Sequence, residues 1–526
     1  MAIDYDIVII GGSLAGYYAA LTATQLGATV ALVEPKVNYG FIYHQALSKI
    51  SNIKQYSGIH PSQPNTAEKS EKFRLGGNHA TSYPFANGDA APTGTLSANK
   101  PTEPPNGVAP QEQTFQDNQL PVAWQERMLY AQSVVSNLEE QHSPGILAAL
   151  GVDVIFGSGQ FQSSPQLAFS VNSRLLTARN YLLATGSRPA IPDIDGLQAT
   201  GYLSLSNIYS SLNKSKLPKN WVIIGGVPQS IEIAQTLSRL GCSVTLVVKY
   251  PYILPHIDPE IAILLQAQLE VEGIRVLTET PVTQVRRIED KKWIQAGDKA
   301  IETDEILVAT GQQPNVESLN LATVGVKWYQ HRLVVNDKLQ TTNHHIYACG
   351  DVIGGYDFAN VANYEARIAL KNALFFTKFR VNYQSIPWAV FSQPTLAQVG
   401  LTEKQAKRQF NRNEVLVLQH YFKTVAAAQI NDETTGICKL IVLSNGEILG
   451  ASILGAAAGE LINLIALAIS RKIKVKHLAN LSPIYPSYSE ILEQTAREWN
   501  KQKLNSNIAL QEFLEGFFHF RRNWNL

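Results

Sequence analysis

The chain has 526 residues, of which 45% are hydrophobic and 17% charged, and this length suits roughly three domains of about 100 to 200 residues each. Its formal net charge of +1 gives neither a basic nor an acidic field, so we expect no nucleic-acid partner. No run approaches the roughly 20 apolar residues of a membrane-spanning helix, and a strand pattern begins almost at the first residue, so we expect a cytoplasmic protein.

The first predicted unit is strand, glycine turn, helix and strand, in "YDIVIIGGSLAGYYAALTATQLGATVALVEP". Gly11, Ser13 and Gly16 hold the three glycine positions of a dinucleotide-binding turn, with Gly12 between the first two. These positions allow a tight turn, the approach of a pyrophosphate to the backbone, and close packing of helix on strand. Glu34 ends the second strand, near the offset at which a carboxylate binds an adenosine ribose. The pattern predicts a dinucleotide-binding fold.

A long polar stretch follows at about 51–120, rich in Pro, Ser, Thr, Asn and Gly. It lacks the aromatic and β-branched residues that a core needs, so we expect a flexible surface insertion. A helical pattern returns in "PVAWQERMLYAQSVVSNLEEQ", at 121–141.

A second strand, glycine turn, helix and strand occurs in "NWVIIGGVPQSIEIAQTLSRLGCSVTLVVKYP". Only Gly225 remains of the three glycines, because Val227 and Ser230 hold the other two positions. Both side chains should obstruct a dinucleotide, so NAD(P)H binding here is doubtful. Lys249 follows Val248, which stands where an NAD site carries an acid. Lys249 either pairs with the 2′-phosphate of NADP or is simply solvated.

From about residue 381 the pattern changes to strands followed by an amphipathic helix, which predicts an α+β domain. The chain ends in "NSNIALQEFLEGFFHFRRNWNL", where apolar residues share one helical face, with two arginines and a tryptophan beyond them: Leu510, Phe513, Leu514, Phe517, Phe518, Arg521, Arg522 and Trp524. Two interpretations are open for this tail: docking on the chain's own dimer, or peripheral contact with a membrane surface.

Three segments carry a family resemblance. "YLLATGSRPAIPDIDGL", "ILVATGQQPNVESLNL" and "IYACGDVIGGYDFANVANYEARIA" resemble the signatures of the FAD-binding pyridine nucleotide-disulfide oxidoreductases, which include glutathione reductase, dihydrolipoamide dehydrogenase and mercuric reductase. The resemblance covers nearly everything except about 51–120 and the last 25 or so residues. It implies an α/β protein, usually a homodimer, with two Rossmann-like dinucleotide-binding domains plus a C-terminal α+β dimerisation domain. We expect an FAD-binding domain, an NAD(P)-type domain, the second part of the FAD-binding domain, an interface domain and a helical tail at 1–189, 190–305, 306–380, 381–500 and 501–526.

The resemblance also implies the cofactor, FAD. Asp351 matches the family aspartate that binds the ribityl hydroxyls of the flavin. The other candidate cofactor-binding residues lie in the same signatures and in the two glycine turns: Gly11, Gly12, Ser13, Gly16, Glu34, Thr185, Gly186, Gly350, Ala362, Gly225 and Lys249.

The catalytic dithiol of the family is missing. Disulfide-reducing members carry C-x-x-x-x-C in the region of "VNYGFIYHQALSKI", where the equivalent positions fall at about Ile42 and Leu47 and no cysteine occurs. The chain has three cysteines, Cys242, Cys349 and Cys438, without a C-x-x-C or a His/Cys cluster around them. We therefore predict small buried residues and no metal site.

The family's proton relay is changed as well. The partner subunit usually supplies His-Pro-x-x-x-Glu, and "SPIYPSYSEIL" has Tyr485 in place of the histidine but keeps Glu490. Glu232 matches a glutamate that pairs with a lysine beside the flavin, and Lys49 is the candidate lysine. His44 lies in the former disulfide region, where it is an acid, a metal ligand, a hydrogen-bond donor to a quinone, or merely structural.

These residues predict an FAD-dependent oxidoreductase that passes electrons to a quinone, a metal ion or oxygen, and not to a disulfide. Two alternatives are kept. In one, a redox protein such as ferredoxin reduces the flavin in place of NAD(P)H. In the other, the chain is a non-catalytic FAD-binding scaffold or regulator.

Overall fold

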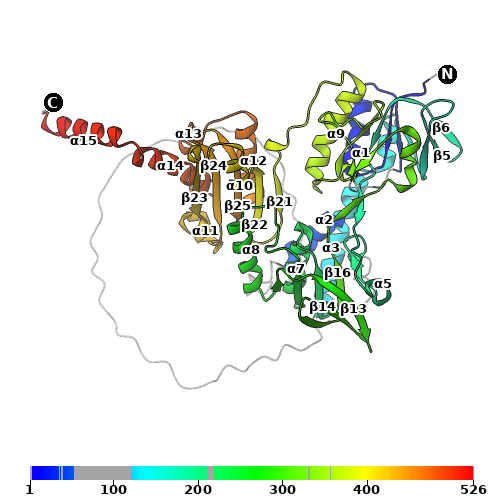
Figure 1. Ribbon diagram of the computed structural model, residues 1–526, viewed down its shortest axis with the longest axis horizontal. Helices are drawn as coiled ribbons and strands as arrows, with labels where there is room; N and C mark the ends of the chain where they lie inside the picture. Colours follow the sequence, from blue (N-terminus) through cyan, green and yellow to red (C-terminus); the bar gives the residue numbers. More distant parts are fainter. Residues whose placement is uncertain are drawn as a thin grey trace, which may run out of the picture.

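The computed structural model describes residues 3–34, 36, 40–51, 120–209, 217–329, 332–355 and 357–524; side chains at 40–41, 48–51 and 120–125 are not included. The predicted insertion at about 51–120 falls almost wholly outside these residues. The described chain forms three units, each built on a five-stranded sheet (Figure 1).

The first unit has a parallel sheet in the order β20-β7-β1-β2-β3. Its strands are β1 (Tyr5–Ile10), β2 (Val30–Val33), β3 (Asp153–Ile155), β7 (Ala178–Leu183) and β20 (Ile346–Ala348). Ile7 and Ile9 pack with α1 (Leu14–Gln25) and α9 (Ala359–Leu374), whereas Val8 and Ile10 face the opposite layer. Because both faces are covered, the strands are apolar at nearly every position.

A small antiparallel sheet forms that opposite layer: β4 (Gly159–Gln162), β5 (Ala168–Val171) and β6 (Arg174–Leu176). Phe161 and Phe169 pack edge to face with ring centroids 5.0 Å apart, and both are fully buried against the parallel sheet. The predicted dinucleotide fold is therefore present, with helices on one face and strands on the other.

The second unit repeats this plan, as its sequence repeat predicts. Its parallel sheet has the order β12-β11-β10-β16-β9, from β9 (Leu203–Ser204), β10 (Asn220–Ile224), β11 (Ser243–Val247), β12 (Arg275–Leu277) and β16 (Glu305–Val308). One face packs on α7 (Pro228–Arg239) and α8 (Pro259–Val271). The other face packs on an antiparallel sheet of β13 (Val282–Ile288), β14 (Lys291–Ala296) and β15 (Lys299–Thr303).

The third unit is an antiparallel sheet in the order β21-β22-β25-β24-β23. Its strands are β21 (Trp388–Val390), β22 (Thr395–Gly400), β23 (Val415–Tyr421), β24 (Ile437–Leu443) and β25 (Ile448–Gly455). One face packs on α12 (Ala458–Ser470), α13 (Val475–Ala479) and α14 (Glu490–Asn505). The other face meets the core of the second unit beside α8, which explains why β24 and β25 are buried throughout. The predicted fold class is confirmed.

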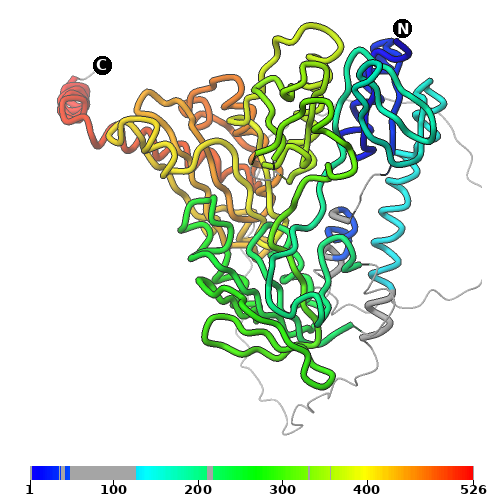
Figure 2. Tube along the Cα trace, turned by 45° about the vertical axis from the view of Figure 1, so that its right-hand side comes forward, coloured from blue at the N-terminus to red at the C-terminus, as the bar shows by residue number. Residues whose placement is uncertain are grey.

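Two helices connect the first and second units. In α2 (Gly40–Ser51) and α3 (Leu120–Gln141), Tyr43 and Leu47 pack against Met128. Figure 2 shows α3 running from the first unit down beside the second. Because α2 also contacts α7, the segment that lacks the expected cysteines lies against the second glycine-turn helix.

Shorter elements complete the described chain: α4 (Pro144–Ala149), β8 (Ser187–Pro189), α5 (Leu197–Thr200), β17 (Gln312–Pro314), η2 (Glu317–Leu319), η3 (Leu321–Val324), β18 (Trp328–Tyr329), β19 (Arg332–Leu333), η4 (Gly350–Ile353), η5 (Tyr383–Ser385), α10 (Glu403–Gln409), η6 (Arg412–Glu414), η7 (Phe422–Thr424) and α11 (Ala426–Ile430). The predicted C-terminal helix is present as α15 (Ile508–Asn523). Among the helices in the described ranges, none has the length and apolarity that crossing a bilayer requires.

A buried charge cluster joins the second and third units. Lys439 on β24 is fully buried, and its Nζ lies 2.7 Å from Glu403 Oε2 and 3.1 Å from Asp258 Oδ2. The same amine pairs with Glu260, in the first turn of α8. Burying a lysine is tolerable only where carboxylates compensate its charge, so this cluster fixes α8 against the sheet.

Candidate active site

The first glycine turn is packed too closely for side chains. A Cβ on Gly11 would lie 2.4 Å from Ala184 O, and a Cβ on Gly16 would lie 2.0 Å from Gly11 O. Gly11 also has a φ of +101°, which L side chains rarely adopt. The turn therefore brings the N-terminus of α1 close to the ends of β1 and β7. Free N–H groups and the helix dipole at such a terminus suit a pyrophosphate, so these residues fit the implied FAD.

Ser13, the departure from the glycine pattern, has a local role. It is the N-cap of α1, and its side chain accepts a hydrogen bond from Gly16 N at 3.3 Å. Gly12 N donates to Glu34 O at 2.7 Å, which brings the end of β2 beside the turn. Glu34 accepts a 2.6 Å hydrogen bond from Ser158 Oγ, a neighbour that sequence analysis did not identify.

The other candidate cofactor residues of the first unit lie at the same edge of the sheet, because β1, β7 and β20 are adjacent parallel strands. Ser187 Oγ donates to Asp351 Oδ2 at 3.0 Å, and burial raises the pKa of Asp351. Thr185 Oγ1 donates to Asn315 O at 2.7 Å, next to Gly186. Asp351 is thus held at the start of η4, where a buried carboxylate can accept hydrogen bonds from sugar hydroxyls.

Glu365, on α9, is a supporting residue that the sequence analysis missed. It accepts hydrogen bonds from Gly350 N and from Tyr383 Oη, both at 2.7 Å. Gly350 also lies against Ala362, whose Cβ would be 3.1 Å from a Cβ on the glycine. The available signal was an acid within the helical pattern that follows the Gly-Asp pair.

Gly16→Ala is expected to weaken FAD binding about tenfold or more, because overpacking costs about 1–3 kcal/mol. The added methyl must displace the backbone of Gly11, which shapes the turn. Titration of apoprotein with FAD, followed by flavin fluorescence, measures this. Gly145→Ala is the matched control, since only Ser143 Oγ lies near its new Cβ, at 3.9 Å. Equal affinities of the two variants would contradict the assignment.

His44 and Glu232 meet where α2 crosses α7. His44 Nε2 lies 3.6 Å from Glu232 Oε2, and the two side chains are 5% and 1% exposed. Within the described part of the chain, neither atom has a hydrogen-bond partner. The separation is longer than a hydrogen bond, so two polar atoms face each other in a water-poor site without being bonded.

The pair is not an ion pair near neutral pH. Burial lowers the pKa of His44 to about 4 and raises the pKa of Glu232 to about 7. Both groups are therefore uncharged at slightly acidic pH, and Glu232 carries the proton. An acid with a pKa near the working pH is suited to proton transfer.

Aromatic side chains surround this pair. The rings of Tyr43 and Tyr209 lie 4.8 Å apart, and the ring of Tyr209 lies 6.1 Å from His44. Tyr43 Oη donates to Met128 Sδ at 3.2 Å. Burial raises the pKa of Tyr209 well above its usual range, so this phenol remains protonated. These side chains exclude water from His44 and Glu232, and their burial disfavours the charged form of each group.

The third unit holds Glu232 in place. Phe391 N donates to Glu232 Oε1 at 2.8 Å, which leaves Oε2 directed toward His44. One and two turns further along α7, Gln235 and Arg239 bond to Gln393, at 2.7–2.9 Å. One face of α7 therefore anchors the segment before β22 and orients the carboxyl group.

The remaining predicted catalytic residues are Lys49, Tyr485 and Glu490. Lys49 lies in α2, but its side chain is outside the described residues. Tyr485 precedes α14 in the third unit and is 76% exposed within this chain. Glu490, the first residue of α14, is buried and accepts a hydrogen bond from Ser487 N at 2.9 Å, which ties the preceding turn to the helix.

The second glycine turn has the same backbone shape with different side chains. A Cβ on Gly225 would lie 2.0 Å from Ala309 O. Val227 is the N-cap of α7, and the fully buried Ser230 donates to Val227 O at 2.7 Å. Lys249 Nζ lies 5.1 Å from the centre of the Tyr250 ring. The turn is folded, but it carries side chains where a dinucleotide needs bare backbone.

The three cysteines are buried, unpaired and in three different core clusters. Burial raises the pKa of Cys242 and Cys438 to about 12 and raises the pKa of Cys349 well above its usual range. Thiol exchange requires an accessible thiolate, so these residues cannot support it. In the described ranges, His, Cys, Asp and Glu side chains form no cluster of three that could hold a metal ion.

Two family models match the chain: "Pyridine nucleotide-disulphide oxidoreductase" over residues 5–366, and its dimerisation domain over residues 386–496. A mercuric reductase of Staphylococcus aureus is 29% identical over 510 residues, covering 95% of this chain and 83% of the relative. A dihydrolipoyl dehydrogenase of Synechocystis is 29% identical, covering 93% and 98%.

A solved structure shares the fold. It is the Cu(II) complex of the HOCl-induced flavoprotein disulfide reductase RclA from Escherichia coli, with a TM-score of 0.73 and 22% identity. The similarity covers 95% of this chain and 100% of that one.

Proposed function

The chain belongs to the pyridine nucleotide-disulphide oxidoreductase family, and from this premise we propose that it is an FAD-dependent oxidoreductase that reduces a small non-disulfide acceptor. Bound FAD would supply reversible two-electron transfer. The residues that would hold it are those of the first glycine turn together with Asp351. The dimerisation domain suggests a homodimer, which would allow Tyr485 and Glu490 to act on the partner's site.

The observation that supports the proposal is a buried acid and imidazole that face each other at the segment where the family's thiols are expected. Within the described chain, α2 presents His44 to Glu232, and the three cysteines lie buried elsewhere. The pair can hold one proton between carboxyl and imidazole, and Tyr43 and Tyr209 keep water from it. An acceptor that takes up protons with electrons, a quinone or oxygen, uses such a pair. A metal ion takes up electrons without protons, so it does not need such a pair.

In the experiment the FAD-loaded full chain is first reduced anaerobically with one equivalent of dithionite. Reoxidation of the flavin is then compared for four acceptors: 1,4-benzoquinone, dioxygen, a Cu(II) salt and glutathione disulfide. Replacing all three cysteines by alanine is expected to leave quinone reduction unchanged within about twofold, because a buried cysteine acts as a small apolar residue. Bound-flavin absorbance controls for folding. Reduction of glutathione disulfide by the native chain, lost in the cysteine-free variant, would disprove the proposal.

A second candidate concerns the electron donor. Val227 and Ser230 occupy the second glycine turn, which supports a redox protein such as ferredoxin as donor in place of NAD(P)H. Anaerobic stopped-flow reduction separates the two. Bleaching of the flavin by NADPH or NADH at the turnover rate would rule out the need for a protein donor. A flavin that no donor reduces would instead favour the non-catalytic scaffold.

A further inference from the structure

The C-terminal helix α15 extends away from the three units. Figures 1 and 2 show it standing clear of the folded body beyond α14, and none of its residues is buried. Its start is capped by Asn507, whose side chain accepts a hydrogen bond from Leu510 N at 3.0 Å. The helix is therefore well formed locally although it lacks packing within this chain.

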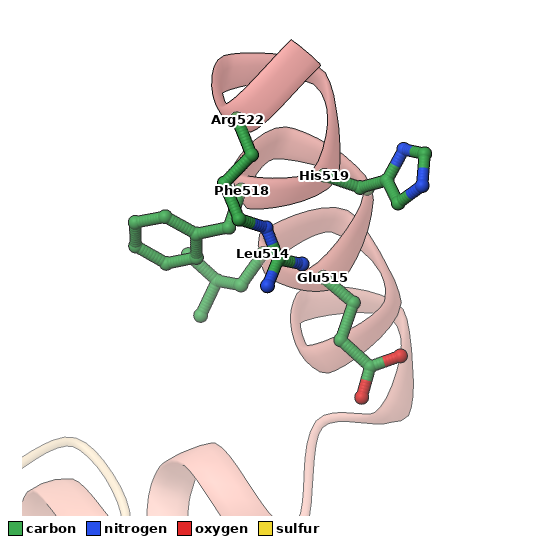
Figure 3. A pocket seen from close by; sticks show the side chains of 6 residues that line it. Leu514, Glu515, Phe518, His519 and Arg522 are labelled. Carbon is green, nitrogen blue, oxygen red and sulfur yellow. The ribbon is translucent and has the colours of Figure 1, made fainter.

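One side of α15 is apolar and exposed. The large side chains on it are 44–65% exposed: Phe513, Phe517, Phe518, Phe520 and Trp524. Figure 3 shows Leu514, Phe518 and Arg522 lying together on one side, with Glu515 and His519 turned away. Phe513 stacks on Phe517 with ring centroids 6.3 Å apart, which continues the apolar side along the helix. A helix with such a stripe buries it against a partner.

We propose that α15 docks on a second copy of this chain, as an arm that extends the dimer interface. This goes beyond the proposed reaction and does not rest on it. The arm continues directly from the dimerisation region. α14 is the last helix of the matched region, and α15 begins at Ile508, directly after it. The same unit exposes other apolar side chains that a partner would cover, including Leu467 at 52% and Ile484 at 82%.

The exposed apolar side of α15 is large enough to form a substantial part of a protein–protein interface. A helix of 16 residues is about 24 Å long, and a fully buried aromatic side chain covers about 150–250 Å². Five half-exposed aromatic residues would therefore bury several hundred Å² per arm, on the order of half of a standard interface partner's share or more. Two arms related by a twofold axis double this contribution, since each surface is used on both subunits.

The charge of α15 favours a protein partner over a lipid surface. The arm carries Glu512 and Glu515 against Arg521 and Arg522, so its formal charge is zero. Helices that lie on membranes usually have a polar face rich in Lys and Arg, which attracts anionic lipids. Here that attraction is absent, whereas a neutral aromatic surface suits a second protein subunit.

Sedimentation equilibrium of the FAD-loaded full chain tests the proposal. The double variant Phe513→Ser/Phe517→Ser is expected to raise the dimer dissociation constant about tenfold or more. The matched control is Glu515→Ser/His519→Ser, because these two side chains are turned away from the apolar side, and its constant should be unchanged. Removal of residues 507–526 should reproduce the double variant. Because α15 has no buried residues, bound-flavin absorbance should be the same in all forms.

Hydrogen exchange provides a second readout. Amides of 508–523 should exchange more slowly in the dimer than after dilution to monomer, and the double variant should lose this protection. Unchanged dissociation constants together with unprotected amides would overturn the proposal. So would flotation of the full chain with phosphatidylglycerol vesicles that depends on Phe513 and Phe517 while dimerisation does not.

Discussion

Glu232→Gln is expected to lower kcat for quinone reduction by about 10²–10⁴-fold, the usual contribution of a positioned acid or base. The amide keeps the size of the side chain and can still meet Phe391 N, but it cannot give up a proton. The measurement is steady-state reduction of 1,4-benzoquinone to the quinol by the FAD-loaded protein, with reduced ferredoxin or NAD(P)H present in excess as the electron donor. Glu270→Gln, on the exposed side of α8, is the control and should be within twofold of the native rate.

The rate of quinone reduction should depend on pH through the protonation of Glu232. The pKa of Glu232 is about 7, raised by burial, so the acid form is present below pH 7 and is lost as the pH rises through that value. The native rate should therefore be level on the acid side of 7 and fall about tenfold per unit above it. His44, with a pKa of about 4, stays neutral across this range. A Glu232→Gln profile that keeps the same descending limb would assign it to another group.

Lys439→Met is expected to lower the free energy of unfolding by about 3–5 kcal/mol, the cost of removing one partner from a buried charge cluster. The change leaves Asp258, which is 2% exposed, beside Glu260 and Glu403 without their shared cation. Methionine matches the length of lysine, so loss of volume contributes little. Urea unfolding followed by tryptophan fluorescence measures the difference.

Lys407→Met is the matched control for the cluster. Lys407 pairs with the same Glu403 at 2.5 Å, but its side chain is 39% exposed, so its removal should cost no more than about 1 kcal/mol. Equal destabilisation by the two variants would show that the burial of Lys439 does not explain its contribution to the free energy of unfolding. The difference should shrink as the pH falls through the pKa of Asp258, which burial raises above its usual range, because a protonated carboxyl group no longer needs the cation.

The sequence by itself determined every feature that depends on residues near one another in the chain. Two glycine turns predicted two dinucleotide folds, because strand, turn and helix follow in order and each apolar strand must be covered on both faces. Gly11 and Gly16 were recognisable since no other residue fits a turn so close to a strand end. The absence of cysteine from 37–50 and the apolar stripe of α15 could be read in the same way.

Only the tertiary structure decided which distant residues meet. The family resemblance brought Lys49 of this segment near Glu232, but it did not indicate that His44 lies opposite Glu232. The same is true of the Ser187 contact with Asp351 and of the lysine cluster around Lys439. Periodic patterns encode which face of an element is buried, whereas the partner on that face depends on how separate elements pack. The titration of Glu232 follows from that packing, because burial between separate elements raises its pKa, and the hydrogen bond from Phe391 N opposes this rise only in part.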